Sequence, residues 1–240
     1  MRRPGLSFVQ RETGVVLLVL AVGLFLLAFR EIAVAVGAGG ARALDQAVYD
    51  ALRPRASAEQ NLSVAWSEIA ARDFSAMGSV SVLAFIVVMT GGLFLALRRR
   101  AEALLLFLAS GSGLALTNYL KDLFHQGRPP LTPEQAAGLN ASFPSGHAML
   151  SATVYLTLGA LIGHFAERRL IRGYALGVAI LLTAMIGLSR IYLGLHWTSD
   201  VLGGWCVGTA WALGWRGMVL AFERIRRKRL RAGLGRETRS

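Results

Sequence analysis

Long runs of apolar residues recur along nearly the whole of this 240-residue chain. The hydrocarbon core of a bilayer is about 30 Å thick, so a helix that crosses it needs about 20 mostly apolar residues. Six runs approach that length, at positions 14–29, 80–97, 103–119, 148–163, 174–188 and 201–220. This pattern predicts an all-α protein built as a bundle of six transmembrane helices.

Three of these runs have an alternative interpretation. The runs at 148–163 and 174–188 are short for a span, and buried helices of a soluble protein also fit them. Six such runs in one chain are, however, hard to house in a soluble core. The first run follows Arg2 and Arg3, as in a secretory signal peptide, but Arg30 comes after it instead of a small-residue cleavage site. We therefore expect the first run to remain as a span.

The composition agrees with a membrane protein. Hydrophobic residues make up 54% of the chain and charged residues 17%, against roughly 45–50% and 25% in soluble domains. A net charge of +12 would suggest a nucleic-acid partner for a soluble protein. Here the arginines gather between the apolar runs and at the C-terminus, so we expect no nucleic-acid partner. The single cysteine, Cys206, excludes an intramolecular disulfide.

The basic clusters predict the orientation in the membrane. Lys and Arg accumulate on the cytoplasmic side, and all of the clusters fall on one side if six helices cross in turn. The clusters lie at positions 2–11, 98–100, 168–172 and 224–231. Both termini are therefore expected in the cytoplasm, and the connections at 40–79, 120–147 and 189–200 are expected on the outward face.

The same layout predicts one domain over residues 1–240. Its core is expected at 80–221, with an outward segment at 40–79 and a basic cytoplasmic tail at 222–240. That tail either rests on anionic lipid headgroups or serves only as a solvated topology signal.

The outward segment carries its own helical pattern. Leu44, Val48 and Leu52 recur at helical spacing, and Trp66 and Ile69 continue the pattern less regularly. This predicts one or two amphipathic helices that lie in the membrane interface. A solvated loop is the alternative.

Three basic side chains stand in the two later outward connections, namely Lys121, Arg128 and Arg190. An Arg side chain can donate hydrogen bonds to two phosphate oxygens at once, and a Lys side chain adds a point charge. Ser145 precedes an apolar run and can cap a helix, and the amides of Ser145, Gly146 and His147 would then point at an anion. Gly146 has no side chain to block that approach. The residues predict a phosphate cradle, although each cation alone could also be an interfacial residue that snorkels to water.

Two histidines and one aspartate of the same face could carry out chemistry on a phosphate. His196 and Asp200 are four residues apart and share a face if that stretch is helical, so Asp200 can accept the Nδ1 hydrogen of His196 and leave Nε2 as a nucleophile. His147, at the start of another helix, can protonate the leaving oxygen and then activate water. We expect neither a metal nor another cofactor, because no Cys, third His or Glu accompanies the histidines at a ligand spacing.

Three motifs in this order resemble the signature of the type-2 phosphatidic acid phosphatase superfamily. They read Lys121-(six residues)-Arg128-Pro129, Pro144-Ser145-Gly146-His147 and Ser189-Arg190-(five residues)-His196-(three residues)-Asp200. The superfamily includes membrane lipid phosphatases, undecaprenyl-diphosphate phosphatases, glucose-6-phosphatase and soluble vanadium haloperoxidases. The resemblance implies His196 as nucleophile, Asp200 as its orienting partner and His147 as acid and base. It implies as phosphate ligands Lys121, Arg128, Ser145, Gly146 and Arg190.

The resemblance therefore implies a lipid phosphatase of the undecaprenyl-diphosphate phosphatase or phosphatidylglycerophosphatase B type. We expect it in a bacterial cytoplasmic membrane, with the active site on the outward face and the lipid tail in the bilayer. Undecaprenyl diphosphate is the first expectation, and phosphatidic acid, phosphatidylglycerol phosphate and lipid A phosphates remain open. Gln126 and Pro130 depart from the pattern of many membrane members, so the headgroup preference is open too.

Two other classes of function remain as alternatives. A vanadium haloperoxidase uses a similar cradle, but that family is largely soluble. A lipid-binding protein without activity would need neither the nucleophile nor the acid that His196 and His147 supply. The sequence does not define an oligomeric state.

Overall fold

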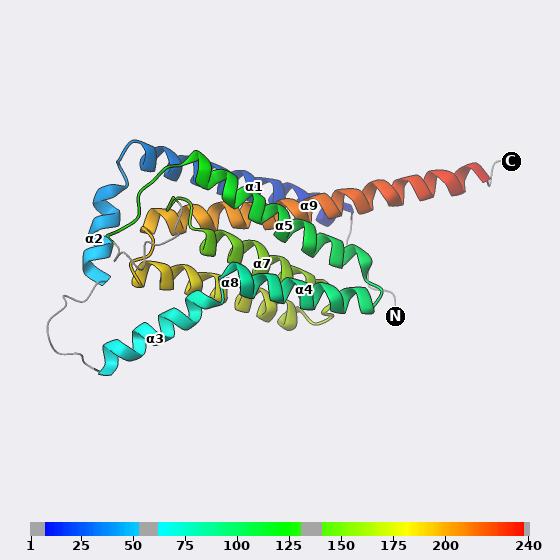
Figure 1. Cartoon of the computed structure of the whole chain (residues 1–240). Helices are drawn as coiled ribbons and strands as arrows, with labels where there is room; N and C mark the ends of the chain where they lie inside the picture. Colours follow the sequence, from blue (N-terminus) through cyan, green and yellow to red (C-terminus); the bar gives the residue numbers. More distant parts are fainter. Residues whose placement is uncertain (1–7, 53–61, 131–140, 238–240) are drawn as a thin grey trace.

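The structure, a computed structural model, describes residues 8–52, 62–130 and 141–237, and within 8–12, 62–65 and 222–237 it defines the backbone only. The expectations for Arg2, Arg3 and the side chains of the basic tail lie outside this part. The regular elements of the described part are all helices, as the sequence predicted (Figure 1). They are α1 (Phe8–Gly37), α2 (Arg42–Leu52), α3 (Leu62–Ala76), α4 (Val80–Ala96), α5 (Arg100–Leu123), α7 (Gly146–Phe165), α8 (Arg169–Tyr192) and α9 (Thr198–Glu237).

Helix α7 forms the centre of the bundle and packs against α5, α8 and α9 (Figure 1). Small residues permit this close packing. A Cβ added to Gly208 of α9 would lie 2.3 Å from the carbonyl oxygen of Met149 on α7. Small residues at helix interfaces let backbones approach closely in membrane proteins. Helix α1 packs on α9, and α4 packs on α5.

The described helices include fewer candidate spans than the six expected. By length and composition, α1, α5, α7 and α8 could each cross a membrane, and α3 with α4 forms a fifth candidate that is bent by 50°. Helix α4 has only 17 residues, and α9 carries glycines, tryptophans and Arg216 in its apolar stretch, which lowers its mean hydropathy. Helices α7 and α8 are longer than the apolar runs that predicted them, because their ends continue into polar residues.

The connections of the bundle separate into two ends. Helix α2 and the connections that follow α5 and α8 lie at one end (Figure 1). The turns from α4 to α5 and from α7 to α8 lie at the opposite end, together with the start of α1 and the end of α9. The basic positions 98–100 and 168–172 therefore share one end of the molecule, and the predicted site residues belong to the other.

The outward segment, predicted to hold one or two helices, holds two, α2 and α3. Helix α2 is not simply an interfacial helix, because Asp45 is 3% exposed and the helix packs on α8 and α9. Leu44 and Trp66, in contrast, are largely exposed, as expected for side chains that meet lipid.

Candidate active site

His196 and Asp200 form a buried pair where the α8–α9 connection enters α9. The His196 Nδ1 atom lies 3.1 Å from Asp200 Oδ2. The side chain of His196 is 2% exposed and that of Asp200 is fully buried. The structure thus shows the predicted contact, but His196 lies before α9, which begins at Thr198, so the two residues do not share a helix face.

Two further donors fix the orientation of the Asp200 carboxylate. Its Oδ2 accepts the backbone N–H of Trp197 at 2.9 Å, as the third residue of a helix does in a capping box. Its Oδ1 lies 3.3 Å from the Ser142 hydroxyl. No local sequence pattern marks Ser142, because its partner lies 58 residues away in the chain.

Arg128 contacts His196, the candidate nucleophile, on the side of the imidazole opposite to Asp200. Its Nη1 donates to the carbonyl of Leu195 at 2.8 Å and lies 3.2 Å from His196 Nε2. A guanidinium only donates hydrogen bonds, so Nε2 must be the acceptor and the ring proton must sit on Nδ1. The contacts on both ring nitrogens therefore select one tautomer, with Nδ1–H toward Asp200.

Lys121 and Arg190 also have protein partners at this end of the bundle. Lys121 Nζ donates to the carbonyl of Ala141 at 2.8 Å. Arg190, 8% exposed, donates from Nη1 to the hydroxyl of Ser75 on α3 at 2.8 Å. The buried Nε of Arg190 has no partner among the described residues. Burial of Arg190 does not fit a snorkelling side chain, and its unpaired Nε is a donor directed into a buried space.

The start of α7 forms part of the same site. Ser145 caps the helix, since its side chain accepts the N–H of Ala148 at 3.5 Å, as predicted. The expectation that the Ser145 amide points at an anion is wrong, because that amide donates to the carbonyl of Asp200 at 2.9 Å. Gly146 and His147 begin the helix, and the first amides of a helix have no acceptor within it. The predicted phosphate cradle can therefore use the amides of Gly146 and His147, but not the amide of Ser145.

The electrostatics of His196 show how much positive charge surrounds it. Burial lowers the pKa of His196 well below its ordinary value of 6.5. Nearby positive groups lower this pKa further, in the order Arg190, Arg128, Lys121 and His147. Burial also lowers the pKa of Arg128, while the Asp200 carboxylate acts in the opposite direction. The three basic side chains among the predicted ligands thus lie within electrostatic reach of the His196 imidazole, and an anion would offset their repulsion.

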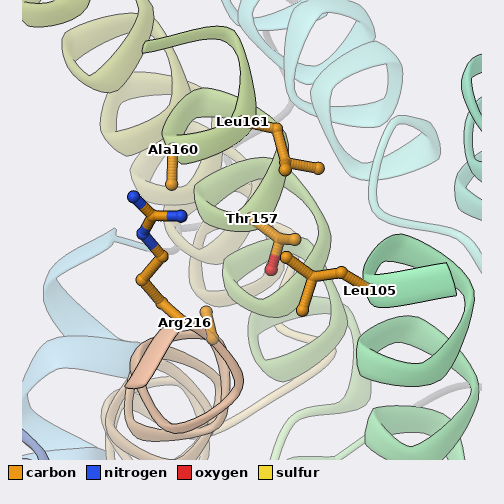
Figure 2. Close-up of a pocket in the computed structure, with 6 residues that line it drawn as sticks. Leu105, Thr157, Ala160, Leu161 and Arg216 are labelled. Atoms are coloured by element: carbon orange, nitrogen blue, oxygen red, sulfur yellow. The ribbon is translucent and has the colours of Figure 1, made fainter. Parts of the chain in front are cut away.

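A metal centre and a cavity are two other kinds of site that the molecule could contain. Within the described part of the chain, no group of three or more His, Cys, Asp or Glu side chains is placed to hold a metal ion. A small cavity lies between α5, α7 and α9 and is lined by Leu105, Thr157, Ala160, Leu161, Ala212 and Arg216 (Figure 2). Leu105 and Lys121 are 16 positions apart on α5, or about 24 Å at 1.5 Å per residue, so this cavity is not the site around His196.

Together, the helical bundle and a buried His–Asp pair with three basic side chains near it define a multi-pass membrane protein with a buried, basic site at one end. The chain belongs to the PAP2 superfamily, which matches residues 102–224. The match covers α5 to the middle of α9 and includes every predicted site residue.

Individual relatives agree with this assignment. The chain is 32% identical to phosphatidylglycerophosphatase B of Bacillus subtilis over 133 residues, which are 55% of this chain and 65% of that protein. It is 34% identical to an undecaprenyl-diphosphatase of Sulfolobus acidocaldarius over 68 residues, which are 28% of this chain and 29% of that protein. The alignments thus span less than two thirds of either relative.

A solved structure shares the fold over a longer stretch. It is the crystal structure of a transmembrane PAP2-type phosphatidylglycerolphosphate phosphatase from Bacillus subtilis. The superposition has a TM-score of 0.71 at 27% identity, and it covers 82% of this chain and 94% of that one.

Proposed function

We propose that this protein is a lipid phosphatase that works through a phosphohistidine on His196. The observation that carries the proposal is the tautomer of His196, with Nδ1–H held by Asp200 and the Nε2 lone pair turned toward Arg128. A neutral imidazole with its proton on Nδ1 keeps on Nε2 the lone pair that attacks phosphorus once the substrate displaces Arg128. A site made only to bind an anion would have no use for this arrangement.

In the first step, the substrate phosphate draws the Arg128 guanidinium from Nε2 onto its own oxygens. The Nε2 lone pair then forms a bond to phosphorus while the bond from phosphorus to the lipid oxygen breaks. His147 gives a proton to that leaving oxygen. Phosphorylation makes the His196 ring cationic, and the Asp200 carboxylate at Nδ1 stabilises this charge.

In the second step, water releases the phosphate. His147, now neutral, takes a proton from the water as the water oxygen attacks phosphorus. The bond from phosphorus to Nε2 breaks, and the electron pair returns to the imidazole. Lys121, Arg128, Arg190 and the amides of Gly146 and His147 hold the equatorial oxygens, because charge neutralisation and in-line positioning are what phosphoryl transfer demands.

The substrate is proposed to be a phosphorylated membrane lipid whose headgroup enters the end of the bundle that holds His196. Phosphatidylglycerol phosphate and undecaprenyl diphosphate are the two lipids of first interest. The relative matched over 65% of its length acts on the first, and the relative matched over 29% acts on the second. The longer alignment favours phosphatidylglycerol phosphate over our first expectation.

The proposed setting is a bacterial cytoplasmic membrane crossed six times by a single domain. In this arrangement α1, α4, α5, α7, α8 and α9 are the spans. The basic positions 98–100 and 168–172 then face the cytoplasm, and the end that holds His196 faces outward. The long helix α9 would continue past the bilayer as the basic tail.

The test is phosphate release from purified protein in detergent with EDTA present. The lipid panel holds phosphatidylglycerol phosphate, undecaprenyl diphosphate, phosphatidic acid and a lipid A phosphate. We expect release from at least one lipid, and an acid-labile phosphoryl group on the wild-type protein. His196→Gln should lose about a thousandfold or more in turnover, as nucleophile variants do. His125→Gln is the matched control, because His125 is exposed. No release from any lipid, or an active His196→Gln protein, would overturn the proposal.

A further inference from the structure

The N-terminus of α9 lacks a cap of its own. The helix begins at Thr198, so Trp197 stands at the N-cap position. An N-cap side chain normally accepts the N–H of the second or third helical residue, but an indole has no acceptor for it. The second residue, Ser199, is nearly fully buried, and an unsatisfied buried amide costs free energy.

Asp45 of α2 supplies the missing acceptor from 154 positions away in the chain. Its Oδ1 accepts the Ser199 N–H at 2.8 Å, and its Oδ2 accepts the Ser199 hydroxyl at 2.6 Å. Both bonds involve a carboxylate, and such charge-assisted bonds are roughly twice as strong as neutral ones. A carboxylate at a helix N-terminus also interacts favourably with the helix dipole.

Other residues of α2 hold Asp45 in this place. The ring of Tyr49 lies 5.7 Å from that of Trp197. Gly194 has a φ of +66°, and a Cβ on it would come within 3.3 Å of the Tyr49 ring. Val48 packs against a buried cluster that includes Val201. Helix α2 is thus fitted closely over the loop that carries His196.

We propose that Asp45 is a positioning residue for the phosphoryl transfer. It fixes the first turn of α9 through Ser199, and this turn holds the Asp200 carboxylate against Nδ1 of His196. Ser199 and Asp200 are adjacent, so a shift of the first turn changes the hydrogen bond that orients the nucleophile. The expected effect of Asp45 on turnover rests on the proposed function. The contact between Asp45 and Ser199 does not depend on it.

The kinetic experiment compares four variants on the lipid that the wild type hydrolyses. Asp45→Ala should lower kcat by about 10- to 100-fold with little change in KM, since small misplacements of reacting groups have effects of this size. Asp45→Asn keeps an acceptor for the Ser199 amide and should retain most of the turnover. Ser199→Ala loses one of the two bonds and should fall between them. Asp50→Ala is the matched control, because Asp50 is an exposed residue of α2 that contacts Gln46.

A second measurement needs no phosphatase activity. In protein labelled with ¹⁵N-histidine, the His196 signals, identified by their loss in His196→Gln, report the tautomer and the Nδ1 hydrogen bond. We expect these signals to move in Asp45→Ala and to stay in place in Asp50→Ala. If Asp45→Ala does not fold, Asp45→Asn and Ser199→Ala carry the same comparison, with smaller shifts.

The outcomes separate the two proposals. An inactive wild type whose His196 signals move in Asp45→Ala overturns the phosphatase but supports the positioning role. An active wild type whose kcat is unchanged in Asp45→Ala overturns the positioning role alone. Signals of His196 that do not move also overturn it, whatever the kinetics show.

Discussion

Nη1 of Arg128 lies 3.2 Å from Nε2 of His196, on the side of the imidazole opposite to Asp200. This contact has two consequences. It fixes the ring proton on Nδ1, and it places a predicted phosphate ligand directly on the atom proposed to attack phosphorus. Burial is the main cause that keeps the His196 imidazole neutral, and the positive charge of Arg128, proposed to bind substrate, acts in the same direction.

Replacing Arg128 should raise the pKa of His196. That pKa lies well below 6.5, and the Arg128 charge is one of its causes. Arg128→Gln removes a positive neighbour and so favours the charged imidazole. In an NMR titration of ¹⁵N-histidine protein, we expect His196 to take up a proton at higher pH in Arg128→Gln than in the wild type.

The lowered pKa of His196 also determines the direction in which the stability of the fold changes with pH. Below pH 6.5 the unfolded chain protonates this histidine while the folded protein does not, so stability should fall as the pH decreases. In Arg128→Gln this loss should be smaller. A His196 pKa that is unchanged or lower in the variant contradicts the assignment of Arg128 as its neighbour.

Ser75 is predicted to orient Arg190 toward the phosphate. The Ser75 hydroxyl holds Nη1 of Arg190 and leaves the buried Nε unpaired. In Ser75→Ala the guanidinium loses a charged hydrogen bond, which contributes about 1.5–3 kcal/mol. We expect inhibition by vanadate, an anion of phosphate shape, to weaken by about 10-fold or more.

Ser67→Ala is the control for this variant. Ser67 also lies on α3, but its hydroxyl contacts Tyr192 and not Arg190. Equal effects of the two substitutions would mean that α3 acts through its stability and not through Arg190.

Gly78 is predicted to set the space available to His147. A Cβ at this position would lie 3.3 Å from Cδ2 of His147 and 2.4 Å from Cγ2 of Ile186. Gly78→Ala should therefore displace the proposed acid and lower kcat, with an overpacking cost of about 1–3 kcal/mol. Gly92→Ala is the control, since nothing lies within 4 Å of its added Cβ. A Gly78→Ala protein with wild-type kcat would show that Gly78 does not set the position of His147.

The orientation in the membrane can be tested by cysteine labelling in intact cells. The background variant is Cys206→Ser, which removes the only cysteine of the sequence. On this background, Asp50→Cys of α2 should react with a membrane-impermeant maleimide, whereas Arg168→Cys should react only after the cells are opened. The reverse pattern would place the site in the cytoplasm.

The sequence alone predicted the His196–Asp200 pair, the Ser145 cap and the all-α architecture. Each of these depends on residues close together in the chain: a four-residue spacing, a serine before an apolar run, and the length of the runs. The contacts of Ser75, Ser142 and Asp45 span 115, 58 and 154 positions. No local pattern marks these three residues, so sequence reasoning could not find them.

What the sequence determined by itself was the set of chemical groups and the helices that carry them, because periodicity and motif spacing are local properties. The tertiary structure decided which groups touch. In the folded protein the Ser145 amide donates to the Asp200 carbonyl, Arg128 contacts Nε2 of His196, and Asp45 caps α9. The physical reason is that a buried donor must find an acceptor, and only the packing of α2, α7 and α9 decides which acceptor lies within reach.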